Sequence, residues 1–200
     1  MTSPDLDSLY QPPSEFIQKA VLPQLMPFHV AYVEQATFFC LATGRAQGLD
    51  ASPRGGRPGF VRVLDQHTIA FADWPGNNRI ESLRNLQDDP RVALLFIFPG
   101  LEVFLRINGT ADISTDAALL ASMTEAGKIP KTAVTIHIQE VLFHCGKAIN
   151  RARLWSEDSR IARDAVPSVG QIAAAITGMA EAQAAAMTDE YHSKVKTELY

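Results

Sequence analysis

The chain has 200 residues, of which 46% are hydrophobic and 20% are charged, a composition typical of one globular domain with short additions. Its formal net charge of −4 gives it no general attraction for nucleic acid or for an acidic membrane surface, so neither is expected as a partner. Any anion bound by this chain must therefore be held by a local group of basic side chains.

The opening segment, MTSPDLDSLYQPPSEF, carries acids and prolines where a secretory signal carries lysines and an apolar core. No apolar run in the sequence approaches the length of a membrane span. Together these two features predict a cytoplasmic protein.

The two cysteines, Cys40 and Cys145, both lie in apolar, strand-like runs. Two reduced thiols are the expected state, because nothing in the sequence supports a disulfide. The CxxC and CxxH spacings typical of zinc sites are absent and the five histidines are scattered, so no metal site is expected.

The chain begins with a polar, proline-bearing arm, residues 1–13, and two short helices are predicted after it. The first is capped by Ser14 and stops near Pro23, and the second runs from Pro27 to about Gln35. Apolar runs bounded by turn residues predict six strands. These strands cover residues 37–43, 59–64, 68–72, 91–98, 101–113 and 133–146.

Between the strands, residues 44–58 are rich in Gly, Arg and Pro and are assigned no strand, and Gly109 is the expected position of a β-bulge. Helices are expected over residues 78–86 and about 115–126. After Trp155 the chain becomes polar, and the alanine-rich run QIAAAITGMAEAQAAAM then has helical periodicity. This tail is expected to pack on the barrel or on a partner subunit, since alone it would be a marginal helix.

Six strands with few, short helices between them predict a mostly β protein of the α+β class, built on an antiparallel β-barrel. The expected organisation has three parts. They are an N-terminal arm with helices (1–35), the barrel (36–155) and a C-terminal helical extension (156–200).

The stretch from Arg57 to Phe96 is the most informative part of the sequence for function. It reads as strand, tight turn, strand, and then PGNNR at the start of a helix. Free backbone amides and cations at a helix N-terminus make a site for a phosphate group. Arg62 alternates with two valines and is expected to face a groove, where it and Arg79 would donate forked hydrogen bonds to the phosphate. The alternative is that both are solvated surface arginines.

In its order of elements and in its residues, this stretch resembles the flavin-binding core of the pyridoxamine 5′-phosphate oxidase-like split barrels. The resemblance covers roughly residues 36–113, including NLQDDPRVALLF, with a weaker similarity up to residue 155. It implies a six-stranded antiparallel split β-barrel with FMN as cofactor. It also implies the cofactor-binding residues, which are Arg57, Gly59, Phe60, Val61, Arg62, Ala72, Asp73, Asn77, Asn78, Arg79 and Arg106.

Several of these residues have alternative roles. Asn78 stands where the family often has a cation, which leaves more of the phosphate charge to the arginines. Asp73 either accepts a hydrogen bond from the flavin or caps the following loop. Trp74 either stacks near the flavin or packs against the barrel mouth. Arg106 either lies near the partner's flavin or pairs with an acid of the other subunit.

A second group of functional side chains lies at the end of the last predicted strand, within HCGKAINRARLW. Such a group at a barrel mouth can bind an anionic substrate or the partner's flavin. Alternatively, His144 is a core histidine and the basic residues solvate a helix start. The candidates for the substrate rim are His144, Lys147, Arg151, Arg153 and Trp155.

The resemblance implies a homodimeric flavoprotein, an oxidoreductase acting on an unidentified small molecule, with NADH or NADPH as a candidate reductant. In a single chain, the strand faces of Val103, Leu105 and Ile107 are expected to be partly solvated, which favours the dimer. The segment SMTEAGKIPKTAV lacks the Arg and Ser arrangement that grips the substrate phosphate in the oxidases proper. Oxidation of pyridoxamine 5′-phosphate is therefore not expected.

No catalytic residue is assigned, and two readings of another class stay open. One is a non-catalytic flavin or haem carrier or sensor, with His29, His67, His137 and His144 as candidate haem ligands. The other is a barrel that has lost its cofactor and serves as an interaction module.

Overall fold

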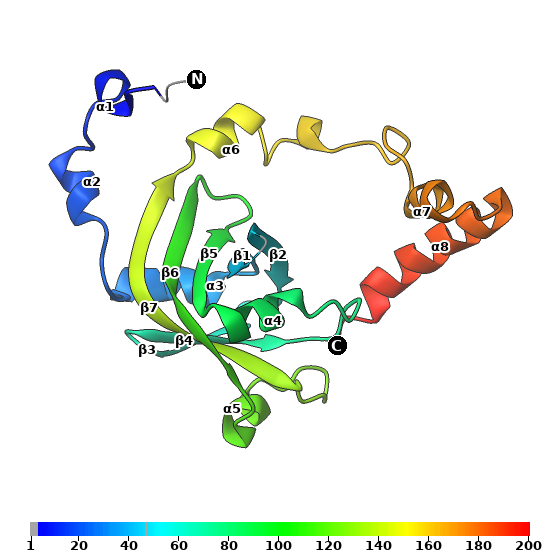
Figure 1. Ribbon diagram of the computed structural model, residues 1–200, viewed down its shortest axis with the longest axis horizontal. Coiled ribbons are helices and arrows are strands. Elements are labelled where there is room, and N and C mark those ends of the chain that lie inside the picture. Colours follow the sequence, from blue (N-terminus) through cyan, green and yellow to red (C-terminus); the bar gives the residue numbers. More distant parts are fainter. Residues whose placement is uncertain (1–3, 47) are drawn as a thin grey trace.

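The computed structural model describes residues 4–46 and 48–200 and is built on one antiparallel sheet of seven strands (Figure 1). The order across the sheet is β2-β1-β5-β6-β7-β4-β3. The strands are β1 (Phe38–Arg45), β2 (Gly48–Gly55), β3 (Val61–Asp65), β4 (Thr68–Asp73), β5 (Arg91–Ile97), β6 (Val103–Ser114) and β7 (Thr132–Cys145).

The predicted antiparallel barrel with peripheral helices is confirmed, but it has seven strands where the sequence predicted six. The additional strand is β2, which pairs with β1 from Phe38↔Gly55 to Arg45↔Gly48 and lies at the edge of the sheet. An edge strand has little to bury, so β2 shows no apolar alternation, and Pro53 is tolerated there. The missing hydrophobic pattern explains why residues 44–58 were assigned no strand.

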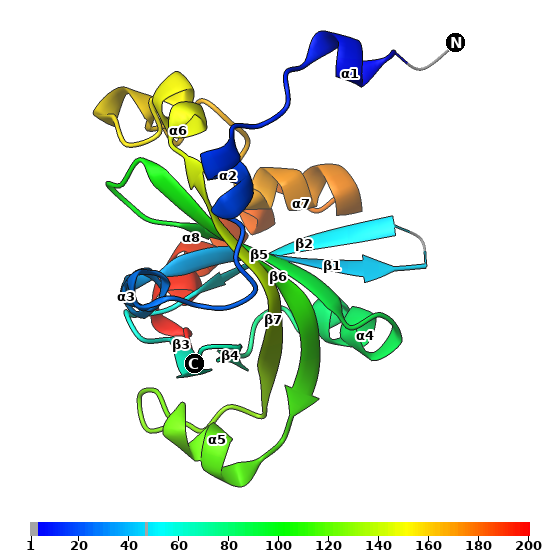
Figure 2. The ribbon, with the colours of Figure 1, turned by 90° about the vertical axis from the view of Figure 1, so that its left-hand side faces the viewer.

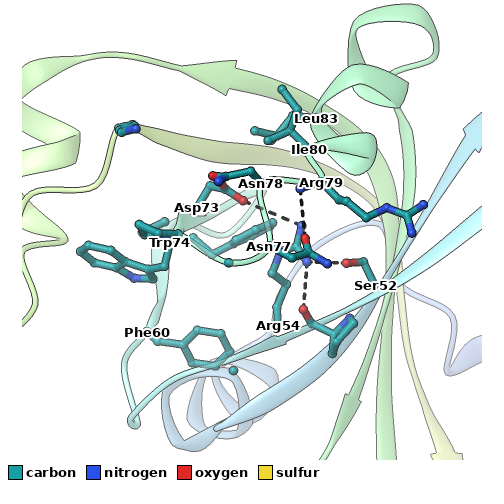
Figure 3. Close-up of a pocket in the computed structure, with 17 residues that line it drawn as sticks. Ser52, Arg54, Phe60, Asp73, Trp74, Asn77, Asn78, Arg79, Ile80 and Leu83 are labelled. Carbon is teal, nitrogen blue, oxygen red and sulfur yellow. Dashed lines mark hydrogen bonds and ion pairs between the residues drawn. The ribbon is translucent and has the colours of Figure 1, made fainter. Parts of the chain in front are cut away.

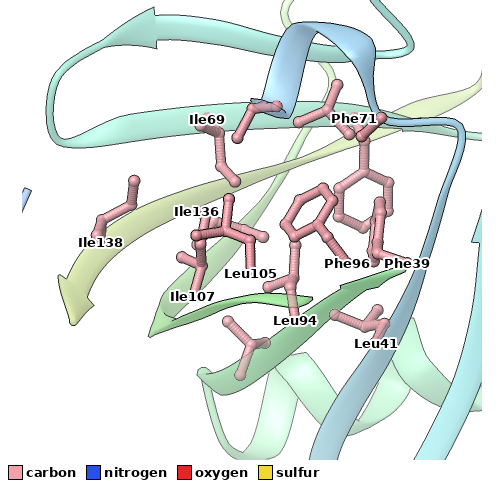
Figure 4. Packing of buried hydrophobic residues seen from close by; sticks show 14 of the residues in the cluster. Phe39, Leu41, Ile69, Phe71, Leu94, Phe96, Leu105, Ile107, Ile136 and Ile138 are labelled. Carbon is pink, nitrogen blue, oxygen red and sulfur yellow. The ribbon is translucent and has the colours of Figure 1, made fainter. Parts of the chain in front are cut away.

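The sheet curls so that strands far apart in its order face each other across the barrel interior. Phe39 of β1 and Phe71 of β4 are in edge contact, with ring centroids 5.1 Å apart, although four positions separate their strands. Leu105 and Ile107 of β6 also point inward and are fully buried (Figure 4). The expectation that these two side chains would be partly solvated was therefore wrong, because β6 directs its odd-numbered residues into the core.

The predicted β-bulge in β6 is confirmed. The register between β6 and β7 shifts between Asn108 and Gly109. A Cβ atom at Gly109 would lie 2.1 Å from the carbonyl oxygen of His137, so only glycine allows the two backbones to approach this closely.

The helices lie around the barrel and along the two ends of the chain (Figures 1 and 2). Those before β7 are α1 (Leu6–Leu9), α2 (Glu15–Lys19), α3 (Pro27–Gln35), α4 (Glu81–Asp88) and α5 (Ala117–Ser122). After β7 come α6 (Lys147–Ala152), a 3-10 turn (Glu157–Ser159), α7 (Val169–Thr177) and α8 (Glu181–Thr197). Gly178, with φ of 73°, divides the predicted alanine-rich helix into α7 and α8. Within the described residues, no helix is both long enough and apolar enough to cross a membrane.

Helix α3 packs on the barrel through Val33 and His29, which are both buried. The Nδ1 atom of His29 accepts a hydrogen bond from the backbone N–H of Met26 at 3.0 Å, and the imidazole stacks on Phe143. Burial lowers the pKa of His29 below 6.5, because a charged imidazole would lose its hydration there. This histidine therefore has a structural role as a neutral part of the α3 N-terminus.

Candidate functional site

A cavity of about 550 Å³ opens between β2, β4 and the loop that leads into α4 (Figure 3). We call it the barrel-mouth pocket. Its polar lining comes from Ser52, Arg54, Asp73, Asn77, Asn78, Arg79 and Lys131. Its apolar lining includes Phe60, Phe71, Ala72, Trp74, Ile80 and Leu83. The volume lies within the roughly 300–1,000 Å³ that is usual for small-molecule sites.

Arg54 is the central cation of this pocket (Figure 3). Strand alternation places it on the same face of β2 as Ser52, and its Nη1 donates to the Ser52 hydroxyl at 2.6 Å and to the Pro53 carbonyl at 2.9 Å. Its Nε is buried and has no hydrogen-bond partner among the described residues. The side chain keeps one unused donor in a half-buried position, which is the arrangement expected of a site for an anion.

Asp73, at the end of β4, is the only carboxylate among the described residues that line this pocket. Its Oδ1 lies 3.9 Å from Nη2 of Arg54, which is a long and weak pair. Burial raises the pKa of Asp73 above 3.8, and the charge of Arg54 opposes this rise. Burial also lowers the pKa of Arg54, although Asp73 counteracts the shift. At this distance, each charge offsets only part of the cost of burying the other, so both Arg54 and Asp73 can still bind a further charged or polar partner.

The loop before α4 supplies the remaining polar groups. Asn77 accepts a hydrogen bond from the backbone N–H of Arg79 at 3.0 Å, and Asn78 has a left-handed backbone with φ of 59°. These features place the start of α4 at Glu81, so the predicted helix start at residue 78 was wrong. The asparagines and Arg79 lie in a turn that precedes the helix. The Arg79 side chain is 72% exposed and pairs with Glu81 at 2.8 Å.

Aromatic side chains line the other side of the pocket. In Figure 3, Phe60 and Trp74 lie away from Arg79 and Ser52. Trp74 makes an edge contact with Tyr200, with centroids 5.0 Å apart, and the Nζ of Lys128 donates to the Tyr200 carbonyl oxygen. The C-terminal segment therefore reaches the rim of the pocket after α8. Cations on one side and flat apolar groups on the other suit a ligand with an anionic end and a planar ring.

The residues predicted to bind a cofactor divide into two sets. Those that line the barrel-mouth pocket are Phe60, Ala72, Asp73, Asn77, Asn78 and Arg79. The others lie elsewhere: Val61 is in the barrel core, Arg57 and Gly59 form the turn before β3, and Arg106 lies in β6. Arg62 is exposed, as the alternation predicted, but its Nη2 donates to the carbonyl oxygen of Ser122 at 3.0 Å and not into the pocket.

Ser52, Arg54 and Lys131 line the pocket but were not predicted as cofactor contacts. For the first two, the available signal was the alternation of polar residues in SPRG, which places both side chains on one face of an extended segment. That signal has meaning only if residues 48–55 form a strand. Lys131 comes from the loop before β7, and nothing local in the sequence connects it with the other two.

A second cavity of about 580 Å³ lies on the outer face of the sheet, beside α6. We call it the sheet-face pocket. It brings together three of the five predicted rim residues, His144, Lys147 and Arg151, with Arg106. The other two point elsewhere: Arg153 pairs with Asp158, and the indole Nε1 of Trp155 donates to the Leu101 carbonyl at 2.8 Å. Both cysteines line this pocket as free thiols.

The candidate haem ligands are not gathered in one place. His29 lies in α3 and is buried against the barrel, and His137 pairs with Asp112 at 3.1 Å. His67 is exposed in the β3–β4 turn, and His144 lines the sheet-face pocket. Across residues 4–46 and 48–200, no three His, Cys, Asp or Glu side chains are grouped closely enough to hold a metal ion.

Three solved structures illustrate the similarity of this chain to known proteins. HupZ from Group A Streptococcus shares 20% identity, with 58% of this chain and 92% of that chain covered and a TM-score of 0.47. General Stress Protein 26 from Bacillus anthracis shares 12% identity, with 57% and 88% covered and a TM-score of 0.46. An F420 reductase shares 21% identity, with 57% and 94% covered and a TM-score of 0.41. No curated protein matches this chain.

A family model gives the assignment. The model described as pyridoxamine 5′-phosphate oxidase matches residues 25–145, which is more than half of the chain. The match begins just before α3 and ends with β7, so it includes the whole sheet and the residues of the barrel-mouth pocket. The chain therefore belongs to the pyridoxamine 5′-phosphate oxidase family.

Proposed function

We propose that this protein is an FMN-binding oxidoreductase that exchanges electrons with a small molecule. The observation that carries the proposal is the half-buried guanidinium of Arg54, whose Nε has no hydrogen-bond partner in the described part of the chain. Leaving such a donor unpaired is unfavourable unless a ligand completes it. Membership of this family favours a flavin phosphate as the anion that does so.

The charges of the barrel-mouth pocket fit the phosphate of FMN. Three cations line it, Arg54, Arg79 and Lys131, against the single carboxylate of Asp73. An excess of positive charge at close range compensates for the net negative charge of the whole chain. The two arginines would hold the phosphate through charge-assisted hydrogen bonds, and the turn at Asn77 would supply further donors.

The aromatic side of the pocket fits the flavin ring. Phe60 and Trp74 present flat apolar surfaces against which an isoalloxazine ring would pack. The Asp73 carboxylate would accept a hydrogen bond from the ring N3–H or from a ribityl hydroxyl. When bound, FMN supplies the hydride or electron transfer, and the protein residues bind it, orient it and exclude water from it.

We also propose that the chain acts as a homodimer. Apolar side chains of both terminal regions are exposed, including Phe16 at 76%, Ile17 at 51%, Ile172 at 49% and Ile176 at 78%. Exposed apolar groups concentrated on helices outside the core favour contact with a second chain. In sedimentation experiments, a stable FMN-loaded monomer would contradict this proposal.

Reduction of the bound flavin tests the oxidoreductase function. Anaerobic addition of NADH or NADPH to the FMN-loaded protein is expected to bleach the flavin absorbance faster than it bleaches free FMN at the same concentration. Bleaching no faster than free flavin with either nucleotide would favour a carrier. Reoxidation with a series of acceptors would then define the substrate.

Pyridoxamine 5′-phosphate is not expected to be the substrate. Between α5 and β7 the chain offers only Lys128 and Lys131 as cations. Lys128 contacts Tyr200, and Lys131 lines the barrel-mouth pocket. Neither forms the rigid, forked donor group that a second phosphate would need.

A further inference from the structure

The C-terminal extension is attached to the barrel at its two ends. The chain leaves the barrel after α6, where Trp155 is hydrogen-bonded to Leu101, and α7 and α8 then lie outside the barrel (Figure 1). From residue 160 onward, a single hydrogen bond joins the described residues of the extension to the barrel. It runs from the Nζ of Lys128 to the carbonyl oxygen of Tyr200. The extension is therefore a strap, with α7 and α8 between two points of attachment.

Helices α7 and α8 form one packed unit on an exposed connection. The backbone N–H of Gly170 in α7 donates to the Thr188 hydroxyl of α8 at 3.1 Å. A Cβ atom at Gly170 would lie 1.7 Å from the carbonyl oxygen of Ala184, so the two helices touch through their backbones. Residues 160–167, which lead into this unit, are all exposed. Exposed connections move more readily than packed elements, so the unit can swing while its far end attaches to the barrel or detaches from it.

The far end of the strap, Tyr200, docks where β4 ends and the loop before β7 begins its strand. Its ring is in edge contact with Trp74, the residue after β4, with centroids 5.0 Å apart. Lys128 belongs to a tight turn that is closed by two backbone hydrogen bonds with Glu125, at 3.0 and 2.8 Å. Trp74 lines the barrel-mouth pocket, and so does Lys131, from the same loop as Lys128. Tyr200 therefore lies at the rim of this pocket, on a site whose backbone is already fixed.

Docking of Tyr200 leaves the interior of the pocket free. Tyr200 is not among the residues that line the cavity, which keeps a volume of about 550 Å³ while the strap is docked. A segment that filled the ligand's place would compete with the ligand and lower its affinity. A side chain at the rim, without ligand contact, interacts equally with the empty and the loaded protein and cannot change the affinity. It can change only how often the pocket opens, and therefore the rates of entry and release.

We propose that Tyr200 is a gating residue, which covers the entrance of the barrel-mouth pocket beside Trp74 and retains the bound flavin. The identity of the ligand rests on the proposed function, whereas the docking of Tyr200 on Trp74 needs no ligand. One aromatic pair and one hydrogen bond hold the docked state, and contacts of this strength break and re-form readily. The flavin enters and leaves while Tyr200 is undocked, so both rates depend on the population of that state.

Stopped-flow measurement of FMN binding to the full chain tests the gate. In Tyr200→Ala, the association and dissociation rate constants are both expected to increase roughly two- to tenfold, the factor that one aromatic pair corresponds to. The dissociation constant is expected to stay the same, because the two rates change together. Lys128→Ala, which removes the other contact of Tyr200, is expected to change both rates in the same direction. Tyr191→Ala is the matched control, since Tyr191 is exposed on α8 and does not line the pocket, and is expected to change neither rate.

Acrylamide quenching of Trp74 fluorescence follows the docking in the absence of flavin. With Trp155→Phe as the background, Trp74 is the single tryptophan of the chain, and Tyr200→Ala is expected to make it more accessible to the quencher. Unchanged quenching or unchanged FMN rates would overturn the proposal. So would an increase of the dissociation rate alone, because Tyr200 would then act through contact with the flavin. Failure of all these proteins to bind FMN would contradict the proposed function, and the quenching alone would then decide whether Tyr200 covers Trp74.

Discussion

Replacing Phe39 by alanine is expected to lower the free energy of unfolding by about 3–5 kcal/mol, the usual cost of deleting a buried aromatic ring. Phe39 is fully buried at the centre of an aromatic cluster. Its ring centroid lies 5.6 Å from Phe60, 5.1 Å from Phe71 and 5.1 Å from Phe96. Because the first two of these rings also line the barrel-mouth pocket, the same substitution is expected to weaken ligand binding.

Urea unfolding measures this effect, provided that the m-value of the variant equals that of the natural chain. Phe28→Ala serves as a matched control, because Phe28 is 52% exposed and its loss leaves no core cavity. A similar decrease in both variants would show that the aromatic cluster around Phe39 does not stabilise the barrel as its burial indicates.

Arg54→Gln is expected to reduce FMN affinity by roughly ten- to a hundredfold, while affinity for riboflavin changes little. The reason is that Arg54 holds an unused donor inside the pocket, where a hydrogen bond to a phosphate is poorly screened by water. Arg79→Ala is expected to have the same selectivity but a smaller effect. Arg79 is 72% exposed and already pairs with Glu81.

Quenching of flavin fluorescence, measured for both ligands with the natural chain and with both variants, gives the six affinities needed. Arg84→Gln is the control, because Arg84 is exposed on α4 and does not line the pocket. Equal losses for FMN and riboflavin in the Arg54 variant would mean that this arginine acts through the stability of β2 and not through the phosphate.

Most of the fold could be predicted because the barrel strands bury alternate residues or continuous apolar runs. The strands β5, β6 and β7 carry that signal over most of their length, and Gly109 marks the bulge. Strand β2 could not be predicted, since an exposed edge strand has no apolar pattern to read. The start of α4 was predicted too early because its apolar spacing extends to Ile80, whereas the left-handed backbone of Asn78 prevents a helix there.

The candidate site was predictable where its residues are contiguous. Residues 72–79 reach the pocket as one segment, so the PGNNR motif and the family resemblance of that segment were sufficient to predict that Ala72, Asp73, Asn77, Asn78 and Arg79 lie together. Arg54 and Lys131 reach it only through the pairing of β2 with β1 and of β7 with β4. Arg62 was placed near the phosphate by its alternation alone. Alternation predicts on which face of a strand a side chain lies, but not which groups of other elements lie beside it. In the fold, Arg62 is hydrogen-bonded to the backbone of Ser122 at the end of α5.

The most direct test of this account is the binding of FMN itself to the purified chain freed of any flavin. One FMN per chain is expected to bind saturably, with riboflavin at least about tenfold weaker because it lacks the phosphate that Arg54 and Arg79 would hold. No saturable binding of FMN, or equal affinities for FMN and riboflavin, would contradict the assignment of the barrel-mouth pocket as a flavin phosphate site.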